Sequence, residues 1–144
     1  MSYTVDLYRG RVQPVSALRD FGTFVALFPQ LIAGPIARYA HLQEQLANRE
    51  HTLPRFAHGL YTFSLGLGKK LLVADTLAAL AAPIFAAGNP GFIDAWVSML
   101  LFSGQIYFDF SGYCDMVIGL GRMFGFEFPE NFNRPYCATS FSNF

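Results

Sequence analysis

The chain has 144 residues, of which 53% are apolar and 14% are charged, against roughly 25% charged residues in an ordinary soluble domain. Ten Lys and Arg balance ten Asp and Glu, which argues against a basic nucleic-acid-binding protein, and the high apolar content argues against a disordered chain. Cys114 and Cys137 are too few for a disulfide framework and lack zinc-ligand spacing, so we interpret both as small apolar residues.

The first of three apolar stretches covers residues 21–37 and contains no charge. A helix that spans lipid needs about 20 mostly apolar residues, and this stretch is only just long enough. Pro29, Gly34 and Pro35 interrupt the backbone hydrogen bonds, so we expect a kinked or re-entrant helix. Residues 38–55 are polar with two leucines four positions apart, which predicts a short amphipathic helix at the membrane interface.

The segment before the second stretch holds the histidines and a glycine-rich helix. Residues 56–68 are predicted to be helical, and Ser64 and Gly68, one turn apart, predict a face for close helix packing. The pattern around the histidines is not that of a nucleophile and its base, so we interpret them as surface residues. The three histidines are His41, His51 and His58.

The second apolar stretch, residues 71–88, contains a single charge, Asp75, and is entered through Lys69 and Lys70. Its length also lies within the range of a membrane-spanning helix. For the two lysines we favour an interfacial anchor over a phosphate site, because long basic side chains reach toward water from the end of an apolar helix.

The third apolar stretch covers residues 95–121 and is interrupted only by Asp109 and Asp115. It is apolar all round rather than along one stripe, which predicts a helix surrounded by protein or lipid. Carboxylates in such a helix are costly and usually face a partner, a cavity or a substrate path. The alternative is that Asp109 caps a helix break or pairs with Arg122. On a continuous helix the two carboxylates point in different directions, so they do not form a general acid and base pair.

A polar, proline-bounded loop, residues 128–136, follows the third stretch. Its composition is typical of a turn. The alternative is a site for an anionic or carbonyl group, which Asn131, Asn133 and Arg134 have the hydrogen-bond donors to bind.

Apolar runs of this length exclude strands, and no alternating pattern indicates a barrel. The sequence therefore predicts an all-α fold, part of a polytopic integral membrane protein with three hydrophobic helical segments and a short amphipathic interfacial helix. A soluble helical bundle is the alternative. Cytoplasmic loops collect basic residues, and residues 89–94 contain none. We expect this turn to face outward and both flanks of the first stretch to face the cytoplasm.

Four segments carry a longer pattern: SYTVDLYRGRV near the start, LFPQLIAGPIAR at 27–38, GLGKKLLVADTLA at 66–78 and QIYFDFSGYCDMVIGLGRMFGFEFPENFNRPY at 105–136. They resemble the membrane-bound O-acyltransferase family, and most closely its bacterial alginate-acetylating branch. The resemblance implies an acyltransferase of the bacterial inner membrane, multi-pass, that passes acetyl groups outward for O-acetylation of an exported polysaccharide, typically alginate. Relatives that transfer D-alanine toward teichoic acids or acetyl groups toward peptidoglycan are the alternatives.

The resemblance also implies substrates, partners and site residues. The acyl donor is expected to be an acetyl thioester or ester, with no bound cofactor or metal. The partners are expected to be membrane lipid and proteins of the polysaccharide export pathway, with no nucleic acid. Residues expected to line or brace the reaction tunnel in a supporting role are Asp109, Asp115, Asn133 and Arg134.

In this family a segment like residues 140–144 runs into a Trp-Arg-Arg-Trp-His motif, and acyl transfer is assigned to that histidine and to one in a later Trp-His. We therefore expect residues 1–144 to be part of a single acyltransferase domain, incomplete at both ends, with no catalytic residue within the chain and no activity alone. Two other classes stay open. One is a non-catalytic membrane interaction segment, and the other is a piece of a transporter, which carboxylates in an apolar helix would fit.

Overall fold

The computed structural model describes residues 2–10, 12, 14, 15, 18–26, 42, 45, 50–132 and 135–140. Within these ranges the regular structure is entirely helical, which confirms the predicted all-α fold. The elements are α1 (Ser2–Tyr8), α2 (Leu18–Ala26), α4 (Leu53–Gly68), the π-helix η2 (Lys69–Ala74), α5 (Asp75–Ala86), α6 (Phe92–Met123) and the short 3-10 helix η3 (Pro135–Cys137).

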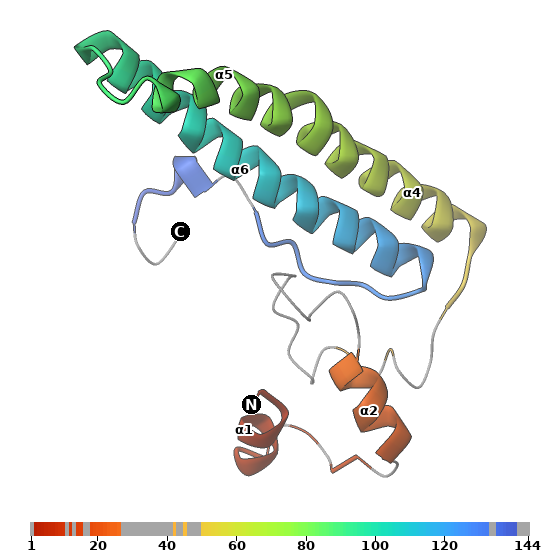
Figure 1. Ribbon diagram of the computed structural model, residues 1–144. Helices are drawn as coiled ribbons and strands as arrows, with labels where there is room; N and C mark the ends of the chain where they lie inside the picture. The colour runs from red at the N-terminus through yellow and green to blue at the C-terminus, as the bar shows by residue number, and fades with distance from the viewer. Residues whose placement is uncertain are drawn as a thin grey trace.

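The dominant feature is a long antiparallel helical hairpin (Figure 1). One arm consists of α4, η2 and α5, which follow one another without a break, and the other arm is α6. With 32 residues, α6 is about 48 Å long at about 1.5 Å per residue. It contains the whole third apolar stretch, as predicted. After α6 the chain turns back and runs along that helix toward η3 (Figure 1).

Local sequence signals set the start of α4 and the end of α6, which lie at the end of the hairpin away from the α5–α6 turn. Thr52 caps α4, where its Oγ1 accepts a hydrogen bond from the backbone N–H of Arg55. At the other end Gly125 has a φ of 81°, a conformation that only glycine adopts without strain. It allows the backbone N–H of Phe126 to reach the carbonyl of Gly121 at 2.9 Å, which closes α6 with a Schellman motif.

Two pairs of glycines let the arms approach closely. A Cβ placed on Gly66 would lie 2.5 Å from the carbonyl oxygen of Gly112, and one on Gly119 would lie 2.6 Å from the carbonyl oxygen of Gly59. Both distances are shorter than any tolerable contact, so the backbones touch at these points. The glycines are seven residues apart on each arm, which places them on one face of each helix.

The predicted packing face of Ser64 and Gly68 is wrong. Nothing lies within 4 Å of a Cβ placed on Gly68, and Ser64 is exposed, with its hydroxyl donated to the carbonyl of Leu60. The glycines that do pack against α6 are Gly59 and Gly66. Gly66 lies two residues from both Ser64 and Gly68, and therefore on a different face of the helix.

A small apolar core joins the N-terminal part of the chain to the end of α6. Its buried members come from α2, from position 42 between α2 and α4, from the C-terminal part of α6 and from the segment that follows α6. They are Phe24, Leu42, Ile118, Phe126 and Phe128. The side chain of Gln45 also donates to the carbonyl of Glu127 and accepts from its N–H.

The first apolar stretch is described only over residues 21–26, which end α2. Its kink at Pro29, Gly34 and Pro35, and most of the amphipathic helix expected over 38–55, lie outside the described residues. None of the helices in the described ranges combines the length and the apolar character needed to cross a membrane.

Candidate functional site

Two ion pairs join the arms near the middle of the hairpin. Lys69 Nζ lies 2.5 Å from Asp115 Oδ2, and Lys70 Nζ lies 2.5 Å from Asp109 Oδ1. The four side chains are between 27% and 49% exposed. In water, pairs this accessible contribute about 0–1 kcal/mol, so their main effect here is to fix the position of η2 against α6.

The backbone explains why two adjacent lysines both reach α6. Gly112 lies three residues from each aspartate. A Cβ placed on Gly112 would lie 3.2 Å from the Lys69 Cβ and 3.2 Å from the Lys70 backbone nitrogen. The absent side chain thus lets η2 lie directly on α6, with one aspartate on either side. A π turn takes more residues per turn than an α turn, so the side chains of consecutive residues diverge less around its axis.

The two alternatives considered for Asp109 are wrong. The helix α6 continues through this position without a break, and the partner of Asp109 is Lys70 rather than Arg122. Arg122 instead donates from Nη1 to Thr62 Oγ1 at 3.3 Å. The interpretation of the two lysines as an interfacial anchor missed their carboxylate partners, which lie 39 and 46 residues away in the sequence.

A polar pocket of about 150 Å³ lies beside Asp115, between α4, α6 and the segment that follows α6. Its polar lining comes from both arms and from that segment, where Asn131 donates to Cys114 Sγ at 3.5 Å. The lining residues are Thr62, Cys114, Asp115, Ile118, Arg122, Glu130, Asn131 and Phe132.

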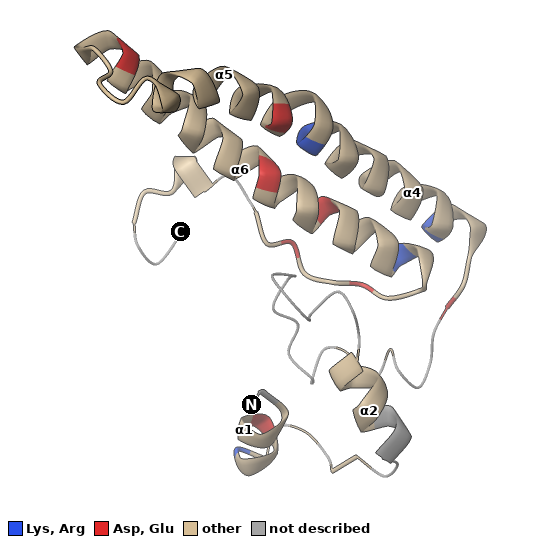
Figure 2. Cartoon of the chain, in the orientation of Figure 1, with Lys and Arg blue, Asp and Glu red and all other residues tan. Residues whose placement is uncertain are grey.

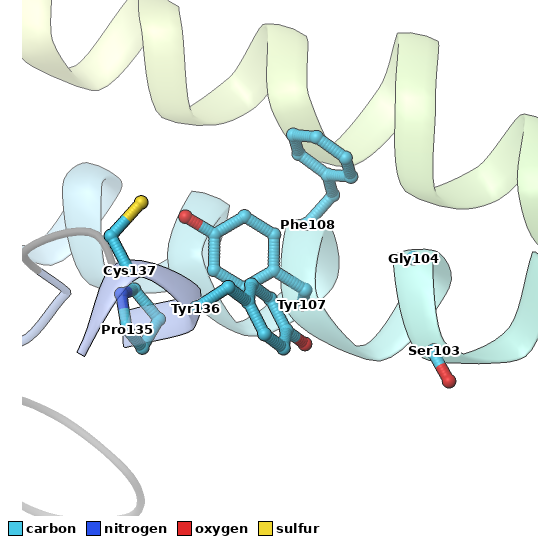
Figure 3. A pocket seen from close by; sticks show the side chains of 7 residues that line it. All are labelled: Ser103, Gly104, Tyr107, Phe108, Pro135, Tyr136 and Cys137. Carbon is cyan, nitrogen blue, oxygen red and sulfur yellow. The ribbon is translucent and has the colours of Figure 1, made fainter. Parts of the chain in front are cut away.

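An apolar pocket of about 470 Å³ lies further along α6, toward the α5–α6 turn (Figure 3). Tyr107 from α6 and Tyr136 from η3 meet here with ring centroids 5.3 Å apart. Phe132 packs on Tyr107 and Phe110 with centroid distances of 5.8 and 5.2 Å. The free thiol of Cys137 also lines this pocket. An aromatic cluster therefore separates the apolar pocket from the polar one.

The structure brings two of the four predicted supporting residues, Asp109 and Asp115, into one site, while Asn133 and Arg134 lie outside the described residues. His51 and His58 are exposed, which confirms their interpretation as surface residues, and His41 lies outside the described residues. Within the part of the chain that the structure describes, no cluster of His, Cys, Asp and Glu side chains is arranged to hold a metal ion.

Sequence reasoning missed several residues of the site. Lys69 and Lys70 were recognised as charged but not as partners of the aspartates. Phe132 was given no role beyond its place in the 128–136 loop, and Thr62 was not singled out. Two signals were present: the glycines recur at intervals of seven, at 59 and 66 and again at 112 and 119, and two lysines match two carboxylates in number. Both signals indicate a pair of helices that face each other.

Comparison with known proteins gives a consistent result. The membrane-bound O-acyltransferase family profile matches residues 6–144. The chain is 51% identical over 144 residues to a probable alginate O-acetylase AlgI of Pseudomonas aeruginosa, covering 100% of this chain and 28% of that protein. It is 43% identical over 134 residues to a peptidoglycan O-acetyltransferase of Helicobacter pylori, covering 90% of this chain and 25% of that protein. It is 27% identical over 127 residues to a teichoic acid D-alanyltransferase of Bacillus subtilis, covering 84% of this chain and 32% of that protein.

The chain thus spans about a quarter to a third of the length of these curated relatives. The family profile, in contrast, covers almost the entire chain, including both arms of the hairpin and the two ion pairs between them. The chain belongs to the membrane-bound O-acyltransferase family.

Proposed function

We propose that the whole protein is an O-acetyltransferase of the bacterial inner membrane that acetylates hydroxyl groups of an exported polysaccharide, with alginate as the favoured acceptor. The observation that carries this proposal is the 51% identity to a probable alginate O-acetylase over the full chain. Transfer to peptidoglycan is the second candidate, supported by 43% identity over 134 residues to a peptidoglycan O-acetyltransferase.

In this proposal the described residues support a reaction whose base lies elsewhere. Acetyl transfer to a hydroxyl requires a base that removes the proton of the alcohol, and a neutral histidine suits this role. Among the described residues, neither pocket is lined by a histidine, so this proposal assigns the base to another part of the whole protein. Asp109 and Asp115, each held by its lysine, brace the helices that surround the acceptor path. The acyl donor is an acetyl thioester or ester, and proteins of the export pathway are the expected partners.

Exposed apolar side chains support an environment of lipid around the hairpin. Between η2 and the middle of α6, large apolar residues are exposed on both arms, and exposed apolar side chains in such number mark a site for lipid or protein contact. The exposed residues in this region are Leu71, Leu72, Leu80, Phe85, Phe92, Ile93, Trp96, Val97, Met99, Leu100, Phe102 and Ile106.

The charge distribution supports an orientation for the hairpin. Between Lys70 and Arg122 the chain contains no Lys or Arg. In Figure 2 the basic residues accordingly lie away from the α5–α6 turn. Because cytoplasmic segments collect lysine and arginine, we propose that the α5–α6 turn faces outward.

Labelling of single cysteines tests this orientation in the whole protein. All native cysteines of the whole protein are first replaced, including Cys114 by alanine and Cys137 by serine, and a single cysteine is then introduced as Pro90→Cys or Thr52→Cys. A membrane-impermeant maleimide applied from outside is expected to label Pro90→Cys and to reach Thr52→Cys only after the membrane is permeabilised. Equal labelling of both positions from one side contradicts the orientation.

The acceptor is tested by deleting the gene in the source organism and measuring acetyl esters on each exported polymer. We expect acetyl release from the alginate-type polysaccharide to fall to background, with acetyl groups on peptidoglycan and D-alanine on teichoic acid unchanged. Loss of peptidoglycan acetylation alone identifies the second candidate. No change in any of the three polymers overturns both.

A further inference from the structure

The α6 side of the polar pocket is one strip of the helix, with an apolar residue between two charged ones. Asp115, Ile118 and Arg122 line the pocket and follow one another at intervals of three and four residues, which places them on the same face of α6. Ile118 is 3% exposed, and Phe132 adds a second apolar group from the segment after α6. The pocket therefore has an apolar wall one helical turn away from an arginine.

Thr62 holds the guanidinium of Arg122 in position at this pocket. The Thr62 hydroxyl donates to the carbonyl of His58 at 2.9 Å and accepts from Arg122 Nη1 at 3.3 Å. A guanidinium has five N–H donors. Among the described residues Arg122 forms no ion pair, although Asp115 and Glu130 line the same pocket. The remaining N–H groups of Arg122 can therefore donate to a ligand.

Asn131 brings a second donor to the pocket. Its side-chain amide directs one N–H at Cys114 Sγ, with 3.5 Å between nitrogen and sulfur. The same amide has a second N–H, and a carbonyl oxygen can accept two hydrogen bonds. One carbonyl oxygen in the pocket thus matches the free donors of Arg122 and Asn131.

The charge and the size of the pocket favour a small neutral carbonyl compound. Asp115 and Glu130 contribute two carboxylates to the lining, and these repel an anion. The volume of about 150 Å³ corresponds to roughly five waters at about 30 Å³ each. An acetyl group fits this space together with the two atoms between which it is transferred, whereas a longer acyl chain would collide with the apolar wall.

We propose that this pocket binds the acetyl group of the acyl donor and excludes longer acyl groups. The carbonyl oxygen accepts hydrogen bonds from Arg122 and Asn131, and the methyl group lies against Ile118 and Phe132. The inference rests on the proposed acetyltransferase function, because it names the residues that select the acyl group for that reaction. In the transfer, the carbonyl carbon exchanges its bond to the donor's sulfur or oxygen for a bond to the acceptor oxygen. The acceptor's proton passes through the base to the leaving group.

Ile118→Val tests the apolar wall, because it removes one methyl group beside the proposed position of the acetyl methyl. Cells that lack the native gene and carry the whole protein, unmodified or altered, are grown with propionate, and their propionyl and acetyl thioesters are measured. Relative to that supply, the unmodified protein is expected to disfavour the additional methylene of propionyl by about tenfold or more. Ile118→Val is expected to raise the ratio of propionyl to acetyl esters on the exported polymers about fourfold, the value of one buried methylene. Phe132→Leu is expected to act in the same direction. The esters are released with mild alkali and quantified by mass spectrometry.

The ratio distinguishes acyl selection from a structural role of the same residue. Ile118 also belongs to the small apolar core, and a loss of packing alone lowers all acyl esters without changing their ratio. Ile106→Val is the matched control, since Ile106 is an exposed isoleucine of the same helix, and it is expected to leave the ratio unchanged. Asn131→Asp exchanges a donor for an acceptor and is expected to lower both esters alike by about tenfold, whereas Asn89→Asp in the α5–α6 turn is expected to have no effect.

Esters are measured on alginate, peptidoglycan and teichoic acid so that the two proposals can fail separately. Acetylated alginate with the same propionyl ratio for Ile118→Val, Phe132→Leu and Ile106→Val overturns the acetyl pocket and leaves the proposed function intact. A raised ratio that occurs on peptidoglycan instead of alginate keeps the pocket and removes alginate as the acceptor. If deletion of the gene changes the esters of none of the three polymers, both proposals are overturned.

Discussion

Gly66→Ala is expected to destabilise the hairpin by about 2–3 kcal/mol, because it forces a methyl group into a contact between two backbones. The new Cβ would lie 2.5 Å from the carbonyl oxygen of Gly112 and 2.7 Å from the backbone nitrogen of Met116. No side-chain rotation relieves a clash with backbone atoms, so the arms must move apart. Overpacking of a tight contact typically costs about 1–3 kcal/mol, and here the separation also strains the neighbouring ion pairs.

The matched control is Gly68→Ala, two residues along the same chain. Nothing lies within 4 Å of a Cβ at this position, and alanine is favoured over glycine in a helix by about 0.8–1.0 kcal/mol. We therefore expect opposite signs: a lower thermal midpoint for Gly66→Ala and an unchanged or higher one for Gly68→Ala. The midpoints are followed by circular dichroism of the purified protein. Equal shifts for the two variants contradict the close approach at Gly66.

The positions of the long helices were predictable because the information is local. Apolar runs longer than any strand lie within the helices that they predict. The capping residue Thr52, which was not predicted, also lies directly before the helix that it caps. The helical identity of residues 95–121 follows from composition alone, and α6 contains all of them. The end of α6 is also local, since it depends on Gly125 immediately after the helix.

Contacts between the arms were not predictable in the same way, because each depends on residues far apart in the sequence. Gly68 and Gly66 belong to the same helix and have the same intrinsic preference, and only the approach of Gly112 distinguishes them. The partner of Asp109 was also misassigned. Arg122 is near Asp109 in sequence, whereas Lys70 is reached only when the two arms fold together.

The polar pocket needed a third kind of information, the path of the chain after α6. Residues 128–136 were recognised as a loop, but nothing in their composition specifies that residues 128–132 return along α6 and place Asn131 against Cys114. The candidate site therefore depends on tertiary packing, while its charged residues were identifiable from their cost in an apolar helix.

Asp109→Asn is expected to lower acetyl transfer by the whole protein at least tenfold, about 1.4 kcal/mol in the activation free energy. Asparagine keeps the size of the side chain and loses the charge that holds the Lys70 ammonium 2.5 Å away. The contact between η2 and α6 then loosens beside the two pockets. A displacement of about 1 Å at a reacting group is enough to reduce a rate by about 100-fold. The rate is measured with labelled acetyl donor in membranes, at equal protein level.

Asp94→Asn provides the control on the same helix, because Asp94 lies exposed in the first turn of α6, and it is expected to retain the unmodified rate. Lys70→Gln removes the other half of the pair and is expected to cause a loss similar to that of Asp109→Asn. If the two residues act as one unit, the double variant loses no more than either single variant, since residues in direct contact are not additive. Additive losses would assign separate roles to Lys70 and Asp109. An unmodified rate for Asp109→Asn at normal protein level removes this carboxylate from the site.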